Sequence, residues 1–317
     1  MKLQTQIPIK KETRNSISHN SSILLLGSCF SENIGNQLNY FKFNSFQNPF
    51  GILFHPKAIE TLITNAINEK VYSEKDIVYQ NERWHCLDAH SNLSSSNKEE
   101  LLTNLNTAIT VTQKKLKEAT HIIITLGTAW VYRFLDTDAI VANCHKISQK
   151  KFLKELLSSD EVSESIAASI TLIKSINKDT VCVFTVSPVR HLKDGFIENT
   201  QSKSHLITGI HNTIDARKNS FYFPSFEIMM DELRDYRFYA EDMIHPNKTA
   251  INYIWEKFSN TWFTEETTQL MKEVDVIQKG LLHKPFNENS EAHQKFLADL
   301  KTKIEKVNAK NKQIYFS

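Results

Sequence analysis

The chain has 317 residues, of which 40% are hydrophobic and 19 are phenylalanine, so it contains enough apolar material for a well-packed core. Its length favours one α/β domain of about 200–250 residues with an appendage. The formal net charge is only +2. A net charge this close to zero produces no strong electrostatic field that would attract nucleic acid or a membrane surface, so we expect neither as a partner.

The four cysteines match no zinc-binding spacing, and we expect no metal site: they are Cys29, Cys86, Cys144 and Cys182. Residues 1–20 form an irregular lead-in without the apolar stretch of a signal peptide. The sequence also lacks the run of about 20 apolar residues that a membrane span requires. We therefore expect free thiols in a reducing cytoplasm.

The first predicted element is a buried strand that ends abruptly. Residues 23–27 are all apolar or glycine, and residues 32–38 that follow the break have helix-like character. Residues at such a break lie at the carboxyl edge of a sheet, beside helix N–H groups that favour negative charge. Ser28 and Cys29 are therefore both candidate nucleophiles. The alternative is that Ser28 or Ser31 only caps the helix.

Strands and helices alternate along the rest of the chain, with an irregular polar segment at residues 70–95. This alternation predicts a parallel, doubly wound sheet. The predicted strands are residues 41–47, 121–127, 181–186 and 220–223. The predicted helices are residues 56–69, 98–118, 149–176, 202–217, 226–235 and 248–261.

Three segments divide the chain: the lead-in at residues 1–20, an α/β domain at 21–263 and a C-terminal helical extension at 264–317. The extension has no predicted strand and consists of two helices, at about 264–280 and 289–311. The lysines of the second helix are interpreted as a solvated face. Three roles stay open for the extension: it packs on the domain, covers the cleft or forms a dimer.

The second informative motif is Asp242-x-x-His245, in a loop that enters the last helix of the α/β domain. This spacing allows the carboxylate to hold the imidazole Nδ1–H, which leaves Nε2 to take a proton from a nucleophile. The loop follows the last strand, so the motif maps to the same sheet edge as Ser28.

Taken together, these motifs resemble the GSCFA family, a branch of the SGNH (GDSL-like) hydrolases. The family motif corresponds to residues 27–31, with Ser31 in place of the final alanine. Further stretches that resemble the family, in the same order, are Asn48-Pro49-Phe50-Gly51, residues 126–129, residues 141–146, residues 187–191, Asp194-Gly195 and residues 236–239. The resemblance covers residues from about 20 to about 262.

The resemblance implies a flavodoxin-like, three-layer α/β/α hydrolase with Ser28 as nucleophile, His245 as base and Asp242 as its orienting partner. It also implies an oxyanion hole built from the N–H groups of Ser28 and Gly51. The third donor of the superfamily is an asparagine, but this chain has Ala129 there. Losing one such donor typically lowers turnover by about 10²–10³. Three residues are candidates for the missing oxyanion donor: Thr128, which is the nearest, Asn143 and His145.

Other polar residues are candidates for substrate binding or for structural roles. Cys29 is expected to point into the helix–sheet core, where buried cysteine acts as a small hydrophobe. His85, Asp88 and His90 fit no zinc pattern and are interpreted as a polar loop that shapes the pocket.

Four more polar side chains are expected near the cleft: Asn143, His145, Arg190 and His191. Asn143 and His145 either reach the cleft or make local loop hydrogen bonds. Arg190 and His191 follow a buried strand at the carboxyl edge, where a cation can read a carboxylate or sugar hydroxyls. The alternative there is a salt bridge to Asp194 or Glu198.

The functional expectation is a serine esterase that removes a small acyl group, such as O-acetyl, from a carbohydrate, without a cofactor. The sugar-ester preference comes only by analogy to the superfamily. The alternatives are a catalytically weak protein that binds a glycan or acylated ligand, and an enzyme that transfers the acyl group to a sugar.

Overall fold

A computed structural model describes residues 5–311 and 313–316 of the chain; residues 1–4 of the predicted lead-in, and residues 312 and 317 of the extension, lie outside the described part. Its centre is a five-stranded sheet in the order β10-β9-β5-β1-β2, in which every neighbouring pair is parallel. The strands are β1 (Ser22–Gly27), β2 (Asn44–Gln47), β5 (His121–Leu126), β9 (Val181–Val186) and β10 (Ser220–Tyr222). The predicted parallel, doubly wound sheet is confirmed.

Helices cover both faces of this sheet because the central strands are apolar on both sides. Leu24 and Leu26 of β1 join the larger core cluster, and Ile23 and Leu25 join the other. The first face is covered by α2 (Pro56–Ile67), α3 (Lys98–Glu118), α4 (Ser159–Ile176) and α5 (Phe196–Thr213). The second face is covered by α1 (Cys29–Tyr40), by the π-helical turn (Ile228–Glu232) that follows the short α6 (Ser225–Glu227), and by α7 (Lys248–Trp262).

Two small antiparallel sheets were not predicted. A hairpin of β3 (Ile77–Gln80) and β4 (Arg83–Cys86) lies in the segment expected to be irregular. A three-stranded sheet is formed by β6 (Trp130–Phe134), β7 (Ala139–Val141) and β8 (Phe152–Leu156). The predicted helix at 149–176 was therefore wrong in its first ten residues. Ser158 forms a capping box with Glu161, which begins the helix at residue 159 and leaves the preceding residues free to pair with β6.

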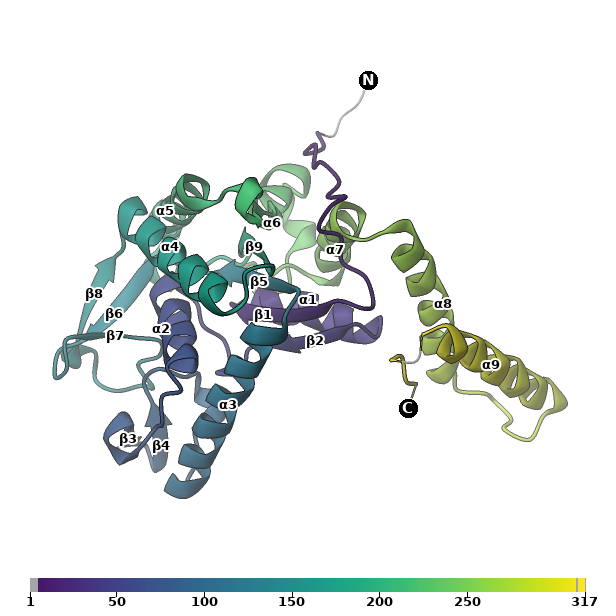
Figure 1. Ribbon diagram of the computed structural model, residues 1–317, viewed down its shortest axis with the longest axis horizontal. Coiled ribbons are helices and arrows are strands. Elements are labelled where there is room, and N and C mark those ends of the chain that lie inside the picture. Colours follow the sequence, from purple (N-terminus) through teal and green to yellow (C-terminus); the bar gives the residue numbers. More distant parts are fainter. Residues whose placement is uncertain (1–4, 312, 317) are drawn as a thin grey trace.

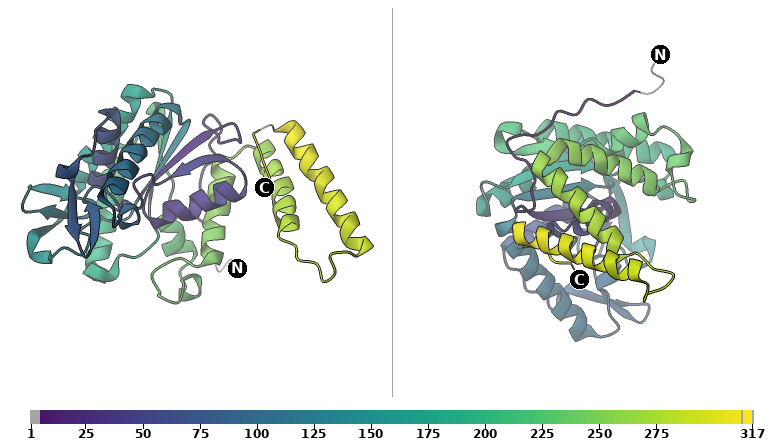
Figure 2. Two further views of the ribbon diagram at one scale, coloured as in Figure 1. Left: turned by 90° about the horizontal axis from the view of Figure 1, so that it is seen from below. Right: turned by 90° about the vertical axis from the view of Figure 1, so that its right-hand side faces the viewer.

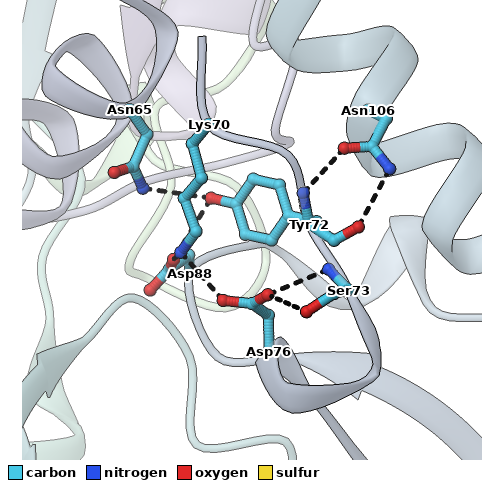
Figure 3. A network of polar contacts seen from close by, with 7 residues as sticks. All are labelled: Asn65, Lys70, Tyr72, Ser73, Asp76, Asp88 and Asn106. Carbon is cyan, nitrogen blue, oxygen red and sulfur yellow. Dashed lines mark hydrogen bonds and ion pairs between the residues drawn. The ribbon is translucent and has the colours of Figure 1, made fainter. Parts of the chain in front are cut away.

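A polar network braces the segment around Asp88 against α2 and α3 (Figure 3). Lys70 Nζ lies 3.4 Å from Asp88 Oδ2, and the Tyr72 hydroxyl donates to the same oxygen at 3.1 Å. Further along, the His90 amide donates to the Phe50 carbonyl at 2.9 Å. The network thereby fixes the segment that supports the turn after β2. Its other members are Asn65, Ser73, Asp76 and Asn106.

The C-terminal extension consists of α8 (Glu265–Leu281) and α9 (Glu291–Lys310), which lie to one side of the α/β body (Figures 1 and 2). It contacts the body through Tyr40, the last residue of α1: the Tyr40 hydroxyl donates to Asp275 at 2.9 Å, and Gln278 donates to the Tyr40 carbonyl at 2.9 Å. Cys29 begins the same helix about 17 Å away. The extension therefore packs on the domain at the end remote from the carboxyl edge, and it is not a cover for that edge. None of the described helices combines the length and the apolar character needed to cross a membrane.

Candidate active site

The candidate site lies where the strand order reverses, between β1 and β5. β1 has β2 on one side and β5 on the other, which is the topological switch point where open α/β sheets form their clefts. The β1–α1 turn, residues 27–29, is formed there. Gly27 has φ +131°, and a Cβ atom on it would lie 2.1 Å from the Thr125 carbonyl oxygen, so only glycine fits this position.

The two candidate nucleophiles have different environments. Ser28 is fully buried: its Oγ accepts the Phe30 amide at 3.3 Å as the N-cap of α1, and its own amide donates to the Thr125 carbonyl at 3.0 Å. Cys29, the first residue of α1, is partly exposed. The expectation that the Cys29 thiol points into the helix–sheet core stays a prediction. Burial, followed by the charge of Glu32, raises the pKa of the Cys29 thiol, and the Lys203 charge and the N–H groups of Cys29 and Phe30 offset only part of that rise.

The Asp242–His245 pair forms as its spacing suggested. His245 Nδ1 donates to Asp242 Oδ2 at 2.6 Å, and Asp242 Oδ1 accepts the amides of Ile244 at 2.9 Å and His245 at 3.0 Å. The His245 amide, the His245 ring and the Ile244 amide, in that order, lower the pKa of Asp242 to about 2. The carboxylate is thus ionised at neutral pH, and the imidazole presents Nε2 outward.

The loop that carries this pair is attached to the end of β9, since the Arg190 amide donates to the Ile244 carbonyl at 3.3 Å. Both side chains of the pair are about half exposed, 50% for His245 and 45% for Asp242. Within residues 5–311 and 313–316, no hydrogen bond joins His245 to Ser28 Oγ. The structure brings the base and the turn to the same edge but shows no bonded serine triad.

The amide groups named for an oxyanion hole already have acceptors. The Gly51 amide donates to the Asn48 carbonyl at 2.8 Å, and the Ser28 amide is bound to Thr125 as described. Thr128 Oγ1 lies 3.0 Å from Ser202 Oγ and accepts the Trp130 amide. These groups therefore stabilise the fold in this conformation, and none is a free donor at the edge.

The side-chain amide of Asn48 is a further candidate oxyanion donor, which was not among the residues expected from the sequence. Its Oδ1 accepts the Gly27 amide at 2.9 Å, which fixes the orientation of the side-chain amide. Its Nδ2 is buried and, among the described residues, has no acceptor. The signal was the Asn-Pro-Phe-Gly turn, whose asparagine has φ 44° and so turns its side chain back onto β1.

Three of the predicted substrate-binding residues, Asn143, His145 and His191, line a pocket of about 650 Å³ beside the switch point. Aromatic and basic side chains share the lining: they include Phe54, Trp130, Tyr132, Lys146 and Lys193. The ring of His145 faces inward, where Nε2 donates to the carbonyls of Cys86 at 2.8 Å and Ala89 at 3.0 Å. Burial lowers the pKa of His145 to about 4, so this ring braces the pocket as a neutral imidazole.

His191 faces Gly127 at the end of β5. Its Nε2 lies 3.0 Å from where a Cβ on Gly127 would stand, and it is buried without a partner among the described residues. Burial, followed by the charges of Lys203 and His245, lowers the pKa of His191 to about 3. Lys203, whose Nζ donates to the Gly127 carbonyl at 2.7 Å, lies in the same neighbourhood as His191.

The remaining two predicted residues lie outside this pocket. Arg190 stacks over the Tyr239 ring, with Cζ 4.4 Å from the ring centre, and lines a separate pocket of about 230 Å³. Its expected partner Asp194 instead pairs with Lys154 at 2.5 Å. His90 lies against Gly51 and caps a short turn, accepting the Asn92 amide at 3.4 Å.

Lys203 was missed and is the least expected residue at this edge. It projects from α5, is 1% exposed, and its Nζ donates to the carbonyls of Gly127 at 2.7 Å and Ser187 at 2.8 Å. Burial lowers the pKa of this amine to about 7. Lys203 precedes Leu206 by three residues and Ile210 by seven, and both of these lie on the buried face of α5. This helical spacing was the sequence signal that Lys203 is buried.

These features define a doubly wound α/β protein with a Gly-Ser-Cys turn and an Asp–His pair at the carboxyl edge of its sheet. The chain belongs to the GSCFA family, whose sequence model matches residues 22–258. A second model, described as the GSCFA domain protein, C-terminal domain, matches residues 274–317 and covers the second half of α8 and all of α9. No curated protein matches the chain.

Proposed function

We propose that this protein is an esterase of the SGNH hydrolase superfamily that cleaves a small acyl ester through a covalent acyl-enzyme. The observation that carries the proposal is the Asp242–His245 pair, with its 2.6 Å hydrogen bond, on the loop attached to the end of β9. The β1–α1 turn lies at the same edge and offers two nucleophilic side chains, of which Ser28 is the one that the family resemblance implies. A general base and a nucleophile at one edge are the minimum set for acyl transfer.

In this reaction the nucleophile attacks the ester carbonyl carbon, the C–O bond to the alcohol breaks, and water then releases the acyl group. Asp242 keeps His245 in the tautomer whose Nε2 can accept a proton. The amide of Cys29 has no acceptor within the described part of the chain, and Asn48 Nδ2 has none either. These two groups are the oxyanion donors in our proposal. Asn48 would supply the third donor, which in the superfamily is an asparagine at the position that Ala129 occupies in this chain.

The proposed substrate is a short acyl group on a carbohydrate. In support, the adjoining pocket combines Trp130 and Tyr132, which offer flat apolar faces, with Asn143, Lys146 and Lys193, which offer hydrogen-bond donors. Such a mixture suits a ring with hydroxyl groups better than a long alkyl chain.

The second candidate is a protein that binds an acylated glycan without turning it over. It is favoured by the internal hydrogen bonds of Gly51 and Thr128, which leave the predicted oxyanion donors occupied. It is also favoured by the buried position of Ser28.

Hydrolysis of p-nitrophenyl acetate and of acetylated monosaccharides by the wild type, His245→Ala and Asp242→Asn separates these two candidates. We expect turnover by the wild type and a loss of at least about 10²-fold in both variants. Lys301→Met, an exposed substitution on the remote α9, is the matched control and should leave the rate unchanged. Saturable sugar binding without turnover would support the binding candidate, and an acetylated acceptor formed in the presence of added sugar would indicate acyl transfer to that sugar.

A further inference from the structure

The pocket of about 230 Å³ around Arg190 contains charged groups that the proposed reaction does not use. Arg190 follows β9 at the carboxyl edge, and its guanidinium lies over two tyrosine rings, with Cζ 4.4 Å from the centre of Tyr239 and 5.6 Å from that of Tyr236. Stacking on a ring uses the flat face of a guanidinium and leaves its N–H edge for a planar acceptor. Tyr239 is buried, so the ring that supports Arg190 is fixed in place.

This pocket shares a wall with the loop of the general base. The Arg190 amide donates to the carbonyl of Ile244, the residue before His245, at 3.3 Å. Tyr239 forms an antiparallel bridge with Pro246, the residue after His245. Residues paired across such a bridge lie about 4.5–5.5 Å apart at their Cα atoms. The two residues that form this wall therefore contact both chain neighbours of the base.

The linings of the two pockets at this edge contain more unpaired cations than carboxylates. Each lining has one carboxylate, and each of these pairs with a cation from outside the lining: Asp194 with Lys154, and Asp235 with Arg237. Four lining cations have no carboxylate within ion-pair distance among residues 5–311 and 313–316: Arg190 and Arg234 in the smaller pocket, and Lys146 and Lys193 in the larger one. Clefts lined by one sign of charge attract ligands of the other sign, so this edge favours an anionic ligand.

Arg190 is the cation of this set whose position is fixed. It is half-buried and stacked, whereas Arg234 is exposed. A lysine ammonium is a point charge on a flexible stem, but a guanidinium offers two parallel N–H groups that match the two oxygens of a carboxylate. A stacked arginine also loses little conformational freedom when it binds such a group.

We propose that the substrate of this site is an acidic carbohydrate ester, whose carboxylate binds the guanidinium of Arg190 while its acyl group lies at the Asp242–His245 pair. This inference rests on the proposed esterase function and names the substrate class within it. The carboxylate accepts two parallel hydrogen bonds from Arg190, and Arg234 adds a second positive charge to the same pocket. Arg190 exchanges no proton and forms no covalent bond; it determines specificity.

Calorimetric titration with two sugars that carry no ester tests this subsite without any turnover. Methyl glucuronide has a carboxylate where methyl glucoside has a hydroxymethyl group. We expect the wild type to bind the glucuronide at least about tenfold more tightly. Arg190→Gln should abolish this preference, and Arg190→Lys, which keeps the charge without the planar fork, should keep only part of it. Arg217→Gln is the matched control, because Arg217 is an exposed arginine that precedes β10 at the opposite edge of the sheet, and it should leave the preference unchanged.

Three results overturn the proposal. The first is a wild type that binds the glucuronide no more tightly than the glucoside. The second is a folded Arg190→Gln protein that keeps the preference. The third is tighter binding of glucose 6-phosphate with no preference for the glucuronide, because the pocket then recognises phosphate. If Arg190→Gln does not fold, the wild-type comparison decides the question on its own.

Turnover of the monoacetylated forms of the same two sugars separates this inference from the esterase function. We expect kcat/KM to be at least about tenfold higher for the acetylated glucuronide, and Arg190→Gln to remove that difference mainly through KM. Equal kcat/KM for the two acetylated sugars would keep the esterase and refute the acidic substrate class. Preferential binding of the glucuronide without any turnover would refute the esterase function and leave the carboxylate subsite in place.

Discussion

Replacing Lys203 by methionine should change how the stability of this protein depends on pH. The amine is fully buried, and its pKa falls from 10.5 to about 7 in the folded state. Below about pH 7 both the folded and the unfolded chain carry the charge, so the full cost of burying it is present. Between about pH 7 and pH 10.5 the unfolded chain binds more protons, and the stability of the wild type therefore rises with pH. Methionine has nearly the same length and no titration in this range.

The size of the effect follows from the shift. The pKa of Lys203 differs by about 3.5 between the unfolded and the folded chain, which corresponds to about 5 kcal/mol because one pKa unit equals about 1.36 kcal/mol. About 3 kcal/mol of this is recovered between about pH 6 and pH 9. The substitution also leaves the carbonyls of Gly127 and Ser187 without their donor, at about 1–3 kcal/mol each. That second cost does not depend on pH, so the pH slope of the difference isolates the buried charge.

Urea unfolding of the two proteins, followed by circular dichroism at several pH values, measures this slope. The free energy of unfolding of the wild type, minus that of Lys203→Met, should increase by about 3 kcal/mol from about pH 6 to pH 9. A difference that stays flat within about 0.5 kcal/mol over this range would refute a buried lysine with a lowered pKa.

Three further substitutions test the edge of the sheet. Asn48→Asp keeps the acceptor for the Gly27 amide but removes the unpaired N–H group, so kcat for an ester should fall by about 10²–10³. An unchanged kcat would exclude Asn48 as an oxyanion donor. Gly27→Ala should destabilise the protein by about 3 kcal/mol or more, because φ is +131° and the new Cβ would lie 2.1 Å from the Thr125 oxygen; a wild-type thermal midpoint would contradict this. Trp130→Phe should raise KM for an acetylated sugar about three- to tenfold at nearly constant kcat, and a fall in kcat alone would count against Trp130 as part of the binding pocket.

The sheet could be predicted from the sequence because β1, β5 and β9 are continuous apolar runs, which are typical of parallel strands buried on both faces. Contact between Asp242 and His245 could also be predicted, because residues three apart in a tight loop come within hydrogen-bond distance. Local spacing determines both features, so one sequence is sufficient.

Other features depend on contacts that the local pattern does not contain. Whether Ser28 or Ser31 caps α1 depends on the residue at which the helix begins, which a sequence does not specify to one residue. The bonds of Gly127 and Thr128 to the Phe54 carbonyl arise from a segment that returns over the end of β5. The strand at 152–156 has an apolar pattern that also suits a helix, and only its pairing with β6 shows which it is.

The central claim is that the turn after β1 forms an acyl-enzyme which the Asp242–His245 loop helps to resolve. It is tested most directly by quenching the reaction with p-nitrophenyl acetate, measuring the intact mass and mapping the modified peptide. We predict an acetyl group on Ser28 in the wild type and none in His245→Ala, because the variant lacks the base that takes the proton of the nucleophile. Turnover without any acetyl group on residues 27–31, or equal acetylation of Ser28 in the wild type and in His245→Ala, would contradict the account.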